Sequence, residues 1–119
     1  MEILMIKLHA NREDQPMNGI MLLNKHLPLT CTEHCPNFQL AHLTEYVQAN
    51  GINLAILNPE QVHPYYTIPY ALLHDLKKKQ ARLDCLMMYS YETIASYDYG
   101  FSENWAELQS YFKEIRYLA

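Results

Sequence analysis

The apolar positions of this chain form short runs that alternate with segments of helical periodicity. Nearly continuous apolar runs of this length are typical of strands that are buried on both faces of a parallel sheet. They occur at residues 19–24, 52–57 and 83–89. Apolar residues at helical spacing predict helices that follow each run. These predicted helices span residues 36–50, 70–80 and 104–118.

This alternation of strands and helices predicts an α/β fold. Parallel strands joined by helices pack as an open sheet with right-handed crossovers and helices on both faces. We therefore expect a single domain over residues 1–119, built in three layers around a mainly parallel sheet. Residues 1–17 predict an additional strand, EILMIKL, followed by the turn sequence NREDQPMN. That strand could extend an edge of the sheet or pair with the next strand as a hairpin.

Composition and charge argue against nucleic acids and membranes as binding partners. Half of the 119 residues are hydrophobic and the net charge is −4, whereas binding to a phosphate backbone needs clustered basic residues. The one basic cluster, Lys77–Lys79 with Arg82, lies where a helix is expected to end, and there it complements the helix dipole. No apolar run reaches the roughly 18 residues that a membrane span needs. The first residues, MEILMIKL, lack an export signal. We expect a cytoplasmic protein that binds neither DNA nor membranes.

Tyrosine is the unusual component of this sequence, with ten copies. Its apolar ring and polar hydroxyl suit half-buried surfaces and protein interfaces. Six tyrosines lie in or beside predicted loops and are candidates for contact with a protein partner: Tyr65, Tyr66, Tyr70, Tyr91, Tyr97 and Tyr99.

The segments from about residue 18 to residue 118 resemble the N-terminal catalytic domain of the serine recombinases, which are the resolvases and DNA invertases. The stretch CPNFQLAHLTEYVQANGINLAIL resembles the family's first helix and the strand after it. LDCLMMYSYETIAS occupies the place of the family's strand that ends in Leu-Asp-Arg-Leu-Ser-Arg. The resemblance implies a resolvase-like domain.

The same resemblance implies that the catalytic groups are missing. In the family a serine attacks the DNA phosphate and several arginines bind and stabilise it. The alignment places Leu27 at the serine and Lys25 at a neighbouring arginine. It places Glu92 at the aspartate, Thr93 at the first arginine of the second motif and Ser96 at its last. A phosphate beside Glu92 without an arginine is repelled.

The resemblance thus implies an inactive recombinase-like domain, not an enzyme, that acts as a protein-interaction or regulatory module without a cofactor. Its partner would be a protein, either a second copy of the chain or a true recombinase. Family members continue after the last helix with a strand, a dimerisation helix and a helix-turn-helix module. Because the sequence ends at Ala119, we expect none of these here.

Two alternatives stay open. Residual DNA strand transfer could use Thr30 or Cys31 as the nucleophile. A zinc-binding regulator could use Cys31, His34 and Cys35, since thiolates and imidazoles are zinc ligands. The spacing lacks a second ligand pair, so no metal site is expected.

Overall fold

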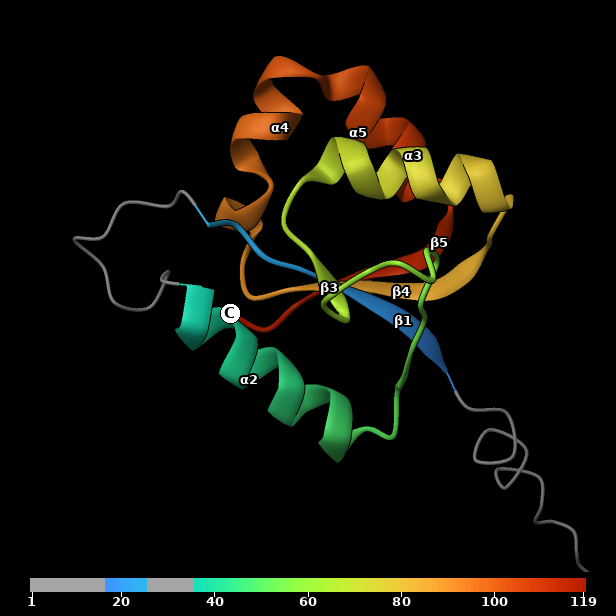
Figure 1. Ribbon diagram of the computed structural model, residues 1–119. Coiled ribbons are helices and arrows are strands. Elements are labelled where there is room, and N and C mark those ends of the chain that lie inside the picture. The colour runs from blue at the N-terminus through green and yellow to red at the C-terminus, as the bar shows by residue number, and fades with distance from the viewer. Residues whose placement is uncertain (1–16, 26–35) are drawn as a thin grey trace, which may run out of the picture.

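The computed structural model describes residues 17–25 and 36–119, and its centre is a parallel five-stranded sheet (Figure 1). The order of strands is β2-β1-β4-β5, and β3 pairs with the same edge of β1 as β2. All of the pairings are parallel, so the predicted mainly parallel α/β sheet is confirmed. The strands are β1 (Asn18–Leu22), β2 (Asn53–Leu54), β3 (Tyr65–Tyr66), β4 (Leu83–Met88) and β5 (Phe112–Tyr117).

Helices cover both faces of the sheet, which gives the three layers that the sequence predicts (Figure 1). Helix α2 (Pro36–Ala49) covers one face, while α3 (Pro69–Lys79) and α5 (Ser102–Gln109) cover the other. A short 3₁₀ helix, η2 (Tyr91–Thr93), and α4 (Ala95–Gly100) connect β4 to α5. None of the helices in the described ranges is long and apolar enough to cross a membrane.

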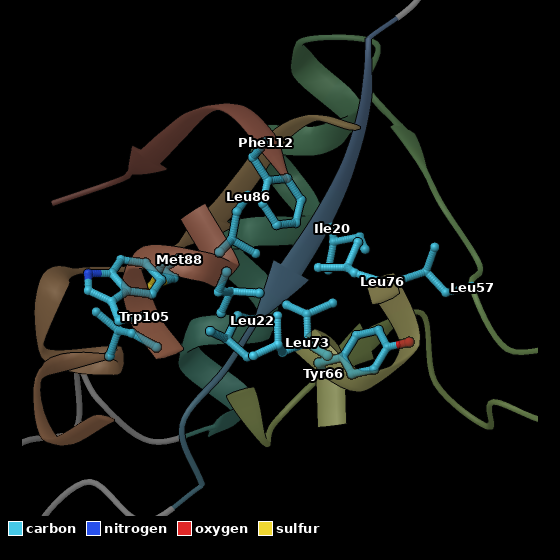
Figure 2. Close-up of a cluster of buried hydrophobic side chains, with 13 residues drawn as sticks. Ile20, Leu22, Leu57, Tyr66, Leu73, Leu76, Leu86, Met88, Trp105 and Phe112 are labelled. Atoms are coloured by element: carbon cyan, nitrogen blue, oxygen red, sulfur yellow. The ribbon is translucent and has the colours of Figure 1, made fainter. Parts of the chain in front are cut away.

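Each face of the sheet has its own hydrophobic cluster. On the α3 and α5 face, Leu73, Leu76 and Trp105 pack against strand residues such as Ile20 and Leu86 (Figure 2). On the α2 face, two helix residues, Leu43 and Val47, pack against strand side chains such as Met21, Cys85 and Met87. Burying one such side chain completely contributes about 1.5–3 kcal/mol, so these two clusters hold the layers together.

Gly19 allows β1 and β4 to pack closely. A Cβ atom at this position would lie 2.8 Å from Met87 Cε and 2.9 Å from Cys85 Sγ, which is closer than atoms in contact approach. The absence of a side chain at Gly19 therefore makes room for Cys85 and Met87 in the core. Cys85 is fully buried, and its burial raises the pKa of the thiol to about 11.

The prediction of a last helix over residues 104–118 is wrong beyond Gln109. The helix ends there, and Phe112–Tyr117 form strand β5 beside β4. Phe112 and Ile115 are three residues apart, a spacing that fits a helix, but both residue types also favour strands. Pairing along the open edge of β4 decides between the two. A further strand after the last helix, which we expected to be missing before Ala119, is thus present.

The additional strand predicted within residues 1–17 lies outside the described residues, apart from Met17. Both edges of β1 are occupied, one by β4 and the other by β2 and β3.

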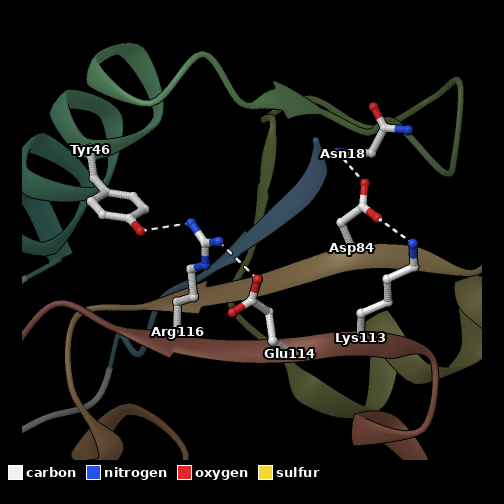
Figure 3. A network of polar contacts seen from close by, with 6 residues as sticks. All are labelled: Asn18, Tyr46, Asp84, Lys113, Glu114 and Arg116. Carbon is white, nitrogen blue, oxygen red and sulfur yellow. Dashed lines mark hydrogen bonds and ion pairs between the residues drawn. The ribbon is translucent and has the colours of Figure 1, made fainter. Parts of the chain in front are cut away.

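The amino end of β1 is attached to β4 through Asp84 (Figure 3). The backbone N–H of Asn18 donates to Asp84 Oδ2 over 2.7 Å, and Lys113 Nζ lies 3.3 Å from Oδ1. The hydrogen bond from Asn18 and the ammonium of Lys113 lower the pKa of Asp84. Because the folded pKa is below the unfolded value of about 3.8, this stabilisation is complete above that value and is lost as pH falls through the folded pKa.

We predict that Asp84→Asn lowers the free energy of unfolding at pH 7 by about 1–2 kcal/mol, because a charged hydrogen-bond acceptor is lost. The difference from the native chain should shrink as the pH falls below about 3.8, where Asp84 itself becomes neutral. Urea denaturation at several pH values measures both effects, with Glu60→Gln at an exposed position as the control. A deficit that is the same at every pH would contradict this role of Asp84.

Candidate functional site

The candidate site lies where the carboxyl ends of β1 and β4 meet. β1 leads through α2 to β2 on one side, whereas β4 lies on its other side, so the strand order reverses between β1 and β4. Ligand sites of open α/β sheets form at such reversal points, beyond the carboxyl ends of the strands. Residues 23–25, the start of α2 and residues 89–93 surround this point.

A buried amide joins these three segments. Gln39 of α2 is fully buried; its Oε1 accepts the backbone N–H of Asn24 at 3.0 Å, and its Nε2 donates to the Asn24 carbonyl oxygen at 3.0 Å. Asn24 Nδ2 in turn donates to the carbonyl oxygen of Thr93 at 3.2 Å. We call these three residues the amide clamp. It holds the end of β1 against both α2 and η2.

Neutral hydroxyl groups lie close to the clamp in sequence. Ser90 Oγ, Thr93 Oγ1 and Tyr97 Oη are buried and, within the described part of the chain, have no hydrogen-bond partner. Burial raises the pKa of Tyr97, so its hydroxyl stays protonated at neutral pH. Amides and protonated hydroxyls exchange hydrogen bonds but carry no charge. These neutral groups are therefore not the cationic side chains with which proteins bind a phosphate.

The described positions aligned with the recombinase active site lie in two segments: Lys25 follows β1, while Glu92, Thr93 and Ser96 lie in η2 and α4 after β4. Lys25 follows Asn24, whose side chain contacts Thr93, so the two segments are side by side. Thr93 is buried, whereas Lys25, Glu92 and Ser96 are exposed. Leu27 lies outside the described residues.

The described arginines are engaged elsewhere. Arg82 precedes β4, at the end of the strand opposite to Thr93, and donates to the Ser110 carbonyl oxygen at 3.0 Å. Arg116 of β5 donates to Tyr46 Oη and Glu114 Oε2, both at 2.8 Å. The third arginine of the sequence, Arg12, lies outside the described residues.

The six candidate tyrosines differ in exposure. Tyr70, Tyr91 and Tyr99 are exposed, and Tyr97 is half-buried. Tyr65 is also half-buried, and its ring stacks on His63 at 4.8 Å between centroids. Tyr66 must be removed from the set, since its ring lies in the core and its hydroxyl donates to Asp75 Oδ2 at 2.6 Å.

The residues of the two alternative hypotheses, the nucleophile and the zinc ligands, lie outside the described residues. Thr30, Cys31, His34 and Cys35 fall in the gap between residues 25 and 36. Across the two described ranges, no three His, Cys, Asp or Glu side chains gather closely enough to hold a metal ion.

The sequence reasoning missed the amide clamp, although a signal for Gln39 was present. Gln39, Leu43 and Val47 recur every four residues and are the buried residues of α2. This spacing puts the glutamine on the inner face of the helix, where a polar side chain must find a partner. Nothing in the sequence identified Asn24 as that partner.

Comparison of the chain with protein-family models, with characterised proteins and with solved structures gives no match.

We predict that Gln39→Leu lowers the free energy of unfolding by about 2–4 kcal/mol, because the N–H and C=O groups of the half-buried Asn24 lose both hydrogen bonds to the Gln39 side chain. Gln39→Glu should also destabilise at neutral pH, since an ionised carboxylate cannot donate to the Asn24 carbonyl. Urea denaturation measures both, and Gln48→Leu on the exposed side of α2 is the matched control. Equal stabilities of Gln39→Leu and Gln48→Leu would show that the clamp contributes nothing.

Proposed function

We propose that this chain is a catalytically inactive serine-recombinase-like domain that acts by binding another protein. The observation that supports the proposal is that the described ends of the two segments that align with the recombinase active site, residues 23–25 and residues 89–93, lie side by side. They lie together at the carboxyl edge of the sheet, joined by Asn24 and Thr93. The described residues at this edge are the neutral amide clamp, buried hydroxyls and the exposed Lys25 and Glu92.

Electrostatics disfavours DNA cleavage at this edge. Removing a single donor that stabilises the transition-state charge costs about 10²–10³ in rate, and the family's several arginines are all substituted. Lys25 is the one cation that the alignment retains, and the negative charge of Glu92, at another aligned position, offsets its positive charge. The net charge of −4 adds an unfavourable long-range field for a polyanion.

An exposed aromatic surface offers a site for a protein partner. We call it the α4 surface; it comprises the exposed Tyr70, Tyr91, Tyr99 and Phe101 and the half-buried ring of Tyr97. The rings of Tyr97 and Phe101 are 5.7 Å apart, and Tyr99 is 94% exposed. Exposed aromatic rings of this kind are enriched at the centres of protein interfaces. A second copy of the chain and a true recombinase are the partners that the resemblance suggests.

The absence of strand transfer is directly testable. We predict that the purified chain leaves supercoiled plasmid intact and forms no covalent adduct with it, because the loops lack groups that stabilise a pentavalent phosphate. Denaturing electrophoresis of plasmid incubated with the protein and Mg²⁺ measures both. An adduct that Thr30→Val or Cys31→Ala removes would replace our proposal with the enzymatic one.

Binding through the α4 surface is tested by photo-crosslinking in cells. We predict that a photoreactive phenylalanine analogue at position 99 captures one specific protein, whereas the same analogue at Val62, which is 86% exposed, does not. Tyr70→Ser should reduce capture from position 99 by at least about tenfold if the rings act together. The same adducts from both positions, or none from either, would contradict binding at this surface.

A further inference from the structure

Among the described strands, β5 stands last in the sheet, and its outer edge has no partner strand there. In the described ranges it pairs only with β4, from Leu83↔Phe112 to Met88↔Tyr117. The Leu83 N–H donates to the Tyr111 carbonyl oxygen at 2.9 Å. This bond determines which residues of β5 direct their backbone groups toward β4. In a regular parallel ladder, the backbone groups of Lys113 and Ile115 then point toward β4, and those of Glu114 and Arg116 point outward.

The side chains along this edge carry opposite charges two residues apart. Glu114 and Arg116 lie on the same face of β5, and their side chains pair at 2.8 Å (Figure 3). Arg116 also donates to Tyr46 Oη of α2, so its guanidinium is fixed in place. Both carboxylate pairing and this bond raise the pKa of Arg116, which stays charged.

We propose that β5 pairs in antiparallel register with β5 of a second copy of the chain, with the two Ile115 residues opposite each other on a twofold axis. Glu114 then faces Arg116 of the second copy, and Arg116 faces its Glu114. Both are outward-pointing residues, so each pair exchanges two backbone hydrogen bonds in addition to its charge contact. On the other face, Lys113 lies beside Tyr117 of the second copy.

The charges select this register among those that the backbone allows. A twofold axis must bring outward-pointing residues opposite each other, and an axis at residue 113, 114 or 116 also satisfies this condition. These three alternatives would oppose Lys113 to Lys113, Glu114 to Glu114 and Arg116 to Arg116, and like charges directly opposite destabilise a strand pair. Only the axis at Ile115 makes the sequence FKEIRY complementary to itself.

This inference does not rest on the recombinase resemblance, because it uses a different surface. The α4 surface can fail to bind a partner while β5 still pairs, and the reverse also holds. One pair of six-residue strands is a small interface, so we expect a dimer that depends on concentration.

The test uses charge exchange at the two paired positions. Glu114→Arg alone and Arg116→Glu alone should each abolish self-association, because like charges then face each other. An equal mixture of the two variants should restore it as a heterodimer, since one chain then carries a positive charge at both positions and the other a negative charge at both. Sedimentation velocity reads out the mass, which is 14.0 kDa for the monomer and twice that for the dimer.

Two further variants keep the test decisive if Arg116→Glu fails to fold without its bond to Tyr46. Glu114→Pro removes an outward N–H and a charge while sparing the ladder to β4, and it should weaken the dimer at least about tenfold. Tyr99→Ser on the α4 surface should leave the dimer unchanged.

Three results would overturn the proposal: a native chain that stays monomeric up to about 1 mM, single charge variants that dimerise as well as the native chain, or a dimer that Tyr99→Ser rather than Glu114→Pro disrupts.

Discussion

The paired hydrogen bonds between the Gln39 side chain and the backbone of Asn24 are the constraint on which the candidate site depends. In a dry interior an amide gains from two aligned hydrogen bonds, and leaving either Asn24 group unpaired would cost about 1–3 kcal/mol. The clamp lies just after the carboxyl end of β1. Its hydrogen bond from Asn24 to Thr93 joins two residues that are 69 positions apart in the sequence. It therefore fixes the relative position of the first loop, helix α2 and η2 with neutral groups alone.

This neutrality links the fold to the proposed function. A phosphate site at the same edge would need cations aimed at the ligand, whereas here the guanidinium groups of Arg82 and Arg116 bind a carbonyl, a phenol and a carboxylate at other parts of the sheet. The features that face solvent are of a different kind. Aromatic rings gather around α4, and a strand edge with alternating charges, open within the described ranges, runs along β5. Both suit contact with proteins more than catalysis.

The sequence predicted the parts of the fold in which one pattern dominates. Continuous apolar runs identified β1 and β4. Helical spacing of apolar residues identified α2 and α3, with bounds within one or two residues of those observed. It failed at β5, because Phe112 and Ile115 stand at helical spacing although both residue types favour strands, and the outcome is decided by long-range pairing with Leu83–Met88. The prediction for Tyr66 was wrong for a similar reason. Its place in a predicted loop suggested that it is exposed, but Tyr65 and Tyr66 pair with β1 as strand β3, and the ring of Tyr66 lies in the core. The contact of Asn24 with Thr93 and the amide of Gln39 that holds Asn24 in place were not predicted.

Backbone hydrogen exchange at Asn24, followed by NMR, tests the central claim most directly. Our account predicts that the Asn24 amide exchanges as slowly as those of Ile20 and Leu22 inside β1, because its N–H donates to the fully buried side chain of Gln39 and is released only when the clamp breaks. The amide of the next residue, the exposed Lys25, should exchange much faster. If Asn24 exchanges as rapidly as Lys25, the two loops are not held together by a fixed neutral clamp, and the account of this edge is wrong.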